Sequence, residues 1–219
     1  MNSPTDTWIN PSPLAPGTLI LASASPRRRE LLSQLGLEFE IRPANIDESP
    51  QVGEVPFDLV RRLALEKATA IAQEDQIGDR RFVLGSDTLV VLDNEPIGKP
   101  ADESEAVRML QRLTGRTHTV MTGIAVVDAH TGSMLAEVVE SSVEMRTAPL
   151  EELQAYVATG ESLDKAGAYA LQGGGRRFVN QVRGSESNVI GLPLEETRTL
   201  LHLARGLSEP KESDSESQI

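Results

Sequence analysis

Short apolar runs alternate with amphipathic stretches along residues 18–207. Consecutive apolar residues predict buried strands, and apolar residues that repeat at helical spacing predict helices with one buried face. On these patterns we expect strands over 18–22, over 81–92 and twice across 118–146, and helices over 57–74, 104–113, 150–159 and 194–204. This order predicts an α/β fold that contains an antiparallel hairpin turning at the sequence DAHTG.

One position of the helix expected over 57–74 interrupts its apolar stripe. The stripe includes Val60, Leu63 and Ile71, and Lys67 occupies the place that would complete it. A lysine in such a position either reaches the surface with its ammonium group or meets an anion inside the protein. Lys67 is therefore a candidate for an anion site.

The strand expected over 81–92 contains a polar island, Gly-Ser-Asp-Thr, at 85–88. A carboxylate such as Asp87 inside an apolar run must be paired, hydrogen-bonded, metal-bound or protonated. A β-bulge at Gly85 would turn Asp87 harmlessly to solvent. An ion pair with Lys99, which the following turn brings back toward the same region, would satisfy Asp87 without any chemistry.

Three consecutive arginines stand where a helix is expected to begin, with Ser25 as the N-cap and Pro26 in the first turn. The N–H groups and partial positive charge of a first turn favour acidic residues, so Arg27, Arg28 and Arg29 oppose the local electrostatics. A bound phosphate would resolve the conflict, because its oxygens accept from both N–H and guanidinium groups. The alternative is three solvated arginines whose repulsion is screened.

The segment over 162–193 is too long and too rich in glycine to be an ordinary connection. Glycine permits close approach of the backbone to a ligand, and Asp164, Lys165 and Gln172 supply polar groups. We expect a ligand-binding loop here, with a solvated surface loop as the alternative.

The composition narrows the classes of function. With 219 residues the chain can form one domain or two closely joined lobes. Its net charge of −12 and aromatic content of 3% argue against a nucleic-acid partner, which favours basic surfaces and aromatic stacking. The chain has no cysteine and no apolar run of membrane-spanning length, so we expect a cytoplasmic protein with no membrane partner.

Two further expectations follow from composition. Residues 1–17 are rich in proline and residues 208–219 are polar and acidic, which predicts a disordered tail on each side of one domain over 18–207. The scattered histidines do not predict a histidine-ligated metal. Mg²⁺ or Mn²⁺ prefers oxygen ligands, which Asp47, Glu48 and Asp87 could provide.

Seven stretches of the chain, in order, resemble the Maf family of nucleoside triphosphate pyrophosphatases. They are LASASPRRRELLSQLG, NIDES, LEKA, GSDTLVVLDNEPIGKP, LTGRTHTVMTGIAV, YVATGESLDKAGAYALQG and VRGSESNVIGLPL. The resemblance implies hydrolysis of a nucleoside triphosphate to the monophosphate and pyrophosphate, and the oxygen ligands noted above make a divalent metal cation, Mg²⁺ or Mn²⁺, the expected cofactor. It also implies an elongated mixed sheet flanked by helices, with two lobes around a cleft as in inosine triphosphate pyrophosphatases, and a homodimer.

The resemblance further implies roles for individual residues. Asp87 matches the position that accepts the proton of the attacking water, and Glu48 matches a further cleft position. From the chemistry of their carboxylates, Glu48 and Asp87 are the expected metal ligands, and whether Asp87 is base, metal ligand or both stays open. Selectivity for base and substrate is implied for Arg27, Thr88 and Gln172. The other cleft positions are Ser23, Arg28, Lys67, Lys99, Asp164 and Lys165.

The sequence LDKAGAYALQG resembles the branch of the family that acts on dTTP and UTP. The amide of Gln172 can pair with the O4 and N3–H edge of thymine or uracil. The chain departs from the usual family sequence at two places, Ser86 and the arginine pair 176–177. These departures concern the base preference more than the hydrolysis reaction. We expect an enzyme that removes non-standard or excess nucleotides. The alternatives are a nucleotide-binding regulator of cell division without significant hydrolysis, and the branch specific for 7-methyl-GTP.

Overall fold

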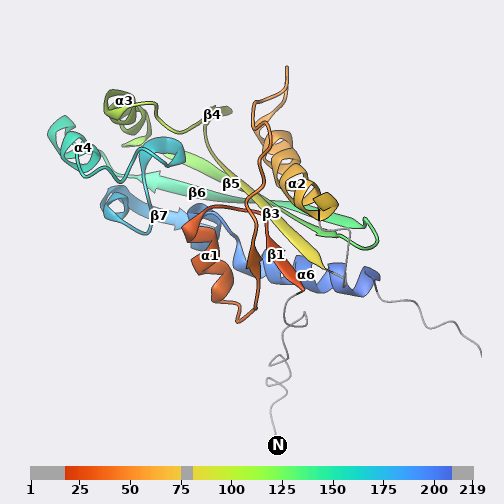
Figure 1. Ribbon diagram of the computed structural model, residues 1–219. Coiled ribbons are helices and arrows are strands. Elements are labelled where there is room, and N and C mark those ends of the chain that lie inside the picture. Colours follow the sequence, from red (N-terminus) through yellow and green to blue (C-terminus); the bar gives the residue numbers. More distant parts are fainter. Residues whose placement is uncertain (1–17, 75–80, 209–219) are drawn as a thin grey trace, which may run out of the picture.

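The computed structural model describes residues 18–74 and 81–208 (Figure 1). The predicted tails, 1–17 and 208–219, lie outside the described residues, except for residue 208 at the end of the last helix. Along the chain the elements are β1 (Leu19–Leu21), α1 (Pro26–Ser33), β2 (Glu40–Ile41), α2 (Pro56–Glu74), β3 (Phe82–Leu92), β4 (Glu95–Ile97), α3 (Glu103–Leu113), β5 (Thr117–Asp128), β6 (Met134–Met145), α4 (Leu150–Val157), η1 (Ala166–Ala168), η2 (Gly174–Phe178), β7 (Val179–Arg183), α5 (Glu186–Ile190) and α6 (Leu194–Ser208).

The strands and helices predicted from the apolar pattern are present. They are β1, β3, the β5–β6 hairpin, α2, α3, α4 and α6. The segment over 162–193 differs from the prediction, because it is not one loop but contains η1, η2, β7 and α5. Ala168 and Phe178 of this segment are fully buried, so its apolar side chains fold it onto the protein.

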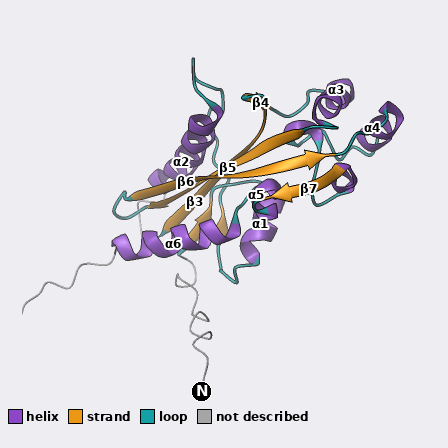
Figure 2. Ribbon diagram, turned by 180° about the vertical axis from the view of Figure 1, so that it is seen from behind, coloured by secondary structure: helices purple, strands orange, loops and turns teal. Residues whose placement is uncertain are grey.

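The described strands form one mixed sheet of seven strands in the order β2-β1-β3-β5-β6-β7, with β4 paired to β3 outside this path. β1 is parallel to β2 and β3, and the remaining pairs are antiparallel. β3 and β5 pair without a register shift from Phe82 to Val91 of β3. These two long strands form the centre of an elongated sheet (Figure 2).

One lobe surrounds the β1 end of the sheet, where helices cover both faces (Figure 2). Leu21 of β1 packs in a core that includes Leu32 of α1 and Leu201 of α6. The neighbouring Ile20 points to the opposite face and packs in a core that includes Ala68 of α2. Alternation of side chains along β1 therefore divides this lobe into two apolar layers.

The second lobe lies at the other end of the same sheet, where Figure 1 shows α3 and α4. Its core joins Val90 of β3, Leu110 of α3, Tyr156 of α4 and Phe178 of η2. The predicted two-lobed α/β architecture with a mixed sheet and flanking helices is confirmed. No helix among the described residues is both long enough and apolar enough to cross a membrane.

Candidate functional site

A gap in the sheet lies beside the middle of β3. On this side β3 pairs with β1 as far as Leu84 and with β4 from Val90 onward, so among the described strands only β5 pairs with residues 85–89. A cavity of about 750 Å³ opens at this gap and takes its walls from both lobes. The predicted site residues all line it: Ser23, Arg27, Arg28, Glu48, Lys67, Asp87, Thr88, Lys99, Asp164, Lys165 and Gln172. The structure brings these residues together, while their individual roles stay predictions.

Lys67 of α2 joins two of the carboxylates that line this cavity. Its Nζ donates to Oδ1 of Asp87 at 2.7 Å and lies 2.7 Å from Oε1 of Glu48. The side chains of Lys67 and Asp87 are only 9% and 10% exposed, whereas that of Glu48 is 55% exposed. The alternative in which Lys67 reaches the surface with its ammonium group is therefore wrong, because Lys67 meets its anions inside the protein.

Two glycines let α2 lie directly on the sheet beside this ion pair. A Cβ at Gly85 would lie 2.1 Å from the carbonyl oxygen of Ala64, and a Cβ at Gly123 would lie 2.3 Å from that of Val60. No larger residue fits at either position without moving the helix. The β-bulge considered for Gly85 is wrong, because the pairing of β3 with β5 continues through it.

Lys99 also lines the cavity, because β4 turns the chain back along β3. The ion pair considered between Lys99 and Asp87 is not formed among the described residues: Asp87 pairs with Lys67, and Lys99 is exposed. Burial alone would raise the pKa of Glu48. The hydrogen bond and charge of Lys67, followed by the charge of Lys99, outweigh burial and hold that pKa below its ordinary value.

α1 begins at the predicted N-cap, where the hydroxyl of Ser25 accepts from the N–H of Arg28 at 3.4 Å. The side chain of Arg28 turns into the cavity, where its Nε donates to the carbonyl of Gly191 at 2.9 Å. Its Nη1 and Nη2 donate to the hydroxyls of Ser23 and Thr88 at 3.2 and 3.1 Å. These three acceptors are uncharged, so they orient the guanidinium group and leave its charge available to an anion.

The other two arginines of this turn differ from each other. Arg27 lines the cavity, and its Nη1 lies 3.8 Å from Oδ2 of Asp164 in the second lobe. Arg29 is exposed and does not line the cavity. The first turn of α1 contains no acidic residue. Two of the three arginines therefore face the site, and the third matches the solvated alternative.

A chain of hydrogen bonds behind Thr88 was not predicted from the sequence. Thr122 lies opposite Thr88 on β5, and their hydroxyl oxygens are 3.0 Å apart. Thr122 donates its single hydrogen to the carbonyl of Asn188 at 3.0 Å. Thr88 must then donate to Thr122, which leaves it accepting from Arg28. The signal in the sequence is a hydroxyl residue inside an apolar strand, and Thr122 is indeed fully buried.

The second lobe contributes the rim of the cavity between α4 and η2. Nζ of Lys165 donates to the backbone carbonyl of Glu161 at 2.8 Å and contacts Oδ1 of Asp164 at 2.5 Å. Gln172 is exposed at the cavity, and its amide makes no hydrogen bond within the described part of the chain. This amide is therefore available to a ligand.

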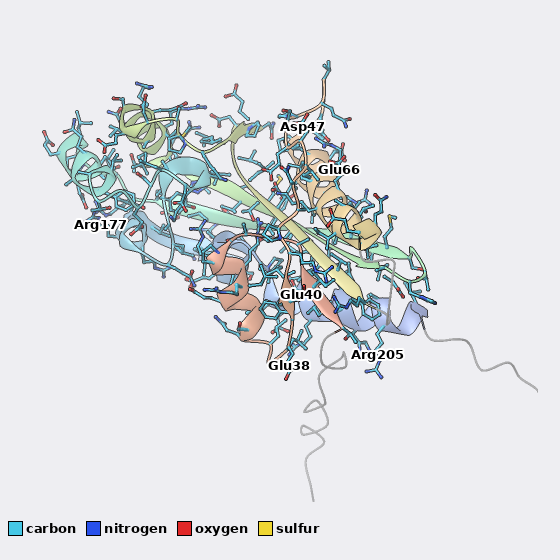
Figure 3. The ribbon with its side chains drawn as sticks, viewed as in Figure 1. Glu38, Glu40, Asp47, Glu66, Arg177 and Arg205 are labelled. Atoms are coloured by element: carbon cyan, nitrogen blue, oxygen red, sulfur yellow. The ribbon has the colours of Figure 1, made fainter. Side chains whose placement is uncertain are left out.

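Two of the three carboxylates predicted as oxygen ligands lie in the cavity. Glu48 and Asp87 both approach Nζ of Lys67, whereas Asp47 is exposed, accepts from the backbone N–H of Ser49 at 2.9 Å and does not line the cavity (Figure 3). No group of three or more acidic or histidine side chains converges as a metal site in the described ranges. Two carboxylates in one cavity nevertheless fit Mg²⁺ or Mn²⁺, which often bind through one or two carboxylates together with substrate phosphates.

The charges that line the cavity favour an anionic ligand. Five lining side chains are basic and three are acidic, in a chain whose net charge is −12. The basic ones are Arg27, Arg28, Lys67, Lys99 and Lys165, and the acidic ones are Glu48, Asp87 and Asp164. A pocket with this local excess selects a small polyanion that can enter the gap.

The fold and this cavity define an α/β protein with a predominantly basic cavity between two lobes. The family model described as "Maf-like protein" matches residues 18–204, so the chain belongs to the Maf family. The resemblance recognised from the sequence motifs is therefore confirmed.

Curated relatives match most of the chain. A dTTP/UTP pyrophosphatase of Geobacter sulfurreducens is 48% identical over 178 residues, which cover 81% of this chain and 92% of the relative. A dTTP/UTP pyrophosphatase of Anaeromyxobacter dehalogenans is 52% identical over 188 residues, which cover 85% and 93%. A crystal structure of a nucleoside-triphosphatase, also named dITP/XTP pyrophosphatase, from Mycobacterium abscessus matches 87% of this chain and 96% of its own, with 15% identity and a TM-score of 0.41.

Proposed function

We propose that the protein hydrolyses nucleoside triphosphates, dTTP and UTP in particular, to the nucleoside monophosphate and pyrophosphate. Its similarity to dTTP/UTP pyrophosphatases supports both the reaction and the bases. The observation that carries the proposal is the ammonium of Lys67 between Glu48 and Asp87, in a cavity with an excess of basic side chains. Attack on a phosphoric anhydride needs cations on the phosphate oxygens and a base for the water, and this arrangement supplies both.

In this proposal the triphosphate lies along the gap beside β3. Arg28 and the N-terminus of α1 hold phosphate oxygens from the first lobe, and Lys67 and Lys99 hold them from the opposite side. The three neutral acceptors of Arg28 fix its guanidinium group before the substrate arrives. Fixed cations stabilise the charge that develops on the departing pyrophosphate without reorganisation during the reaction.

Asp87 takes the proton of the water that attacks the α-phosphorus. The hydrogen bond from Lys67 to Oδ1 fixes the carboxylate, while its second oxygen is available to the water. Glu48 and Asp87 would hold a divalent cation, Mg²⁺ or Mn²⁺, which would neutralise phosphate charge when bound. Both carboxylates would then share their positive neighbours, Lys67 and the cation.

The base binds toward the second lobe. The free amide of Gln172 pairs with the O4 and N3–H edge of uracil or thymine, while Arg27 and Thr88 contribute to selectivity from the first lobe. Asp164 and Lys165 close the rim beside them. In this function the protein is a cytoplasmic homodimer without nucleic-acid or membrane partners, and it removes non-standard or excess nucleotides.

The test is turnover of dTTP, UTP, CTP, dITP, GTP and 7-methyl-GTP with Mg²⁺ or Mn²⁺, with products separated by chromatography. We expect monophosphate and pyrophosphate from dTTP and UTP. Asp87→Asn should keep the fold and nucleotide binding and lose nearly all turnover. Preference for 7-methyl-GTP would overturn the assignment to the branch that acts on dTTP and UTP. Nucleotide binding without turnover by the unaltered protein would favour the regulator, and normal turnover by Asp87→Asn would refute the role of Asp87.

A further inference from the structure

Glu161 lies outside the cavity but binds the segment that carries Gln172 into it. Its Oε2 accepts from the backbone N–H of Gly174 at 2.9 Å, and its Oε1 accepts from that of Gly175 at 3.3 Å. Its Oε1 also accepts from the hydroxyl of Tyr156 at 2.8 Å. One carboxylate thus binds two backbone groups just after Gln172 and a side chain of α4.

Tyr156 holds the same segment on the other side of Gln172. Its hydroxyl oxygen accepts from the N–H of Ala170 at 3.1 Å. The ring is fully buried in the core of the second lobe, where it meets Phe178 edge-on and lies under the guanidinium group of Arg177, at the outer end of the lobe (Figure 3). The Tyr156–Glu161 pair therefore ties both flanks of Gln172 to the core of the second lobe.

The backbone of this segment is shaped around the carboxylate. A Cβ at Gly173 would lie 2.5 Å from the carboxylate oxygens of Glu161, and a Cβ at Gly175 would lie 2.6 Å from the carbonyl of Ala170. The segment can lie this close to Glu161 because residue 173 is a glycine, and Gly175 lets it fold back against the backbone of Ala170. Since the amide of Gln172 has no hydrogen bond of its own in the described chain, its backbone anchors determine where it lies.

We propose that Glu161 is a positioning residue that sets Gln172 at the polar edge of the pyrimidine base. The inference rests on the proposed function, in which Gln172 contacts the base. Glu161 does not line the cavity, so it acts through the segment it anchors. Its carboxylate suits this task because three donors converge on it and a carboxylate presents acceptors only.

Glu161→Gln tests this with little change of shape. The amide oxygen can still accept from Tyr156, but the amide nitrogen faces a backbone N–H, and donor meets donor. We expect the backbone around Gln172 to loosen. The matched control is Glu151→Gln, the same change at an exposed carboxylate on α4.

The readout is preference for the base edge rather than total activity. UTP is compared with the triphosphate of the pyrimidin-2-one nucleoside, which keeps the ring but lacks O4 and N3–H. The ratio of their kcat/KM values measures recognition of that edge. We expect Glu161→Gln to lower this ratio roughly 3- to 10-fold, the value of one hydrogen bond, mainly through KM for UTP. The control should keep the ratio of the unaltered protein.

A double-mutant cycle separates positioning from general damage. Gln172→Ala should lower the ratio alone, and adding Glu161→Gln to it should lower the ratio no further, because both changes remove the same contact. Equal losses for both substrates in Glu161→Gln, an additive loss in the double variant, or an unchanged ratio in either single variant would each overturn the inference. If Glu161→Gln does not fold, Tyr156→Phe removes the donor from the other end of the same bond and serves in its place. Failure of the proposed function is distinguished beforehand, as absence of UTP hydrolysis by the unaltered protein.

Discussion

Replacement of Lys67 by methionine isolates the energetics of the buried ion pair. Methionine is similar in length and apolar, so it fills the space of the lysine but leaves Asp87 without its cationic partner. Removing one partner of a buried pair costs about 3–5 kcal/mol. Asp87 is 10% exposed and bears this cost, whereas Glu48 is 55% exposed and can turn toward water. We therefore expect Lys67→Met to lower the free energy of unfolding by about 3 kcal/mol, the lower end of that range.

Adding Asp87→Asn to Lys67→Met should restore much of the lost free energy of unfolding. Replacing both members of a buried pair by uncharged groups is often nearly neutral, so we expect the double variant to recover about 2 kcal/mol relative to Lys67→Met. Urea unfolding at pH 7 measures both values, with m monitored to detect departures from two-state behaviour. Arg61→Met, at an exposed position of α2, is the control and should change stability by less than about 0.5 kcal/mol. A fully stable Lys67→Met, or a double variant as unstable as the single one, would refute the reasoning.

Two further predictions concern the sheet and its buried histidine. In Gly85→Ala the new Cβ meets a backbone atom 2.1 Å away, so α2 must move by about 1 Å. Urea unfolding should show a loss of about 3 kcal/mol with little turnover remaining, whereas Gly206→Ala in α6, where the Cβ meets nothing, should stabilise by up to about 1 kcal/mol. Burial lowers the pKa of His118 to about 4. The unfolded chain binds this proton near pH 6.5 and the folded protein only near 4, so acidification between these values favours unfolding. The urea midpoint should fall less between pH 7 and 5 in His118→Gln than in the unaltered protein, and equal falls would contradict this account.

The residues that could be found from sequence are those that violate the pattern of their own element. Lys67 interrupts an apolar helical stripe and Asp87 interrupts an apolar strand, and each violation has a cost that a partner must offset. That they are partners of each other was not visible, because the contact joins two elements whose relative placement does not follow from the sequence. The ion pair with Lys99 was considered as an alternative because the turn after β3 brings Lys99 back toward Asp87.

Glycine was the hardest residue to interpret, because the contact that requires a glycine can come from a distant segment of the chain. Gly85 suggested a bulge within β3, yet the space it leaves is filled by the carbonyl of Ala64 on α2. The glycines around Gln172 suggested a loop that approaches a ligand, yet Gly173 lies against the carboxylate of Glu161 and Gly175 against the backbone of Ala170. Thr122 and Glu161 were missed because a threonine in a strand and a glutamate after a helix are weak signals, and their roles become visible only with their partners.

The two lobes share their strands, which has a consequence for cooperativity and motion. β3 gives Leu84 to one core and Val90 to the other, and β5 gives Ile124 and Val120 in the same way. Neither lobe can lose its core without breaking strands on which the other depends, so we expect both to unfold in one transition. Relative movement of the lobes must bend continuous hydrogen-bonded strands. Breathing of the cleft is therefore an elastic deformation of the sheet rather than rotation about a linker.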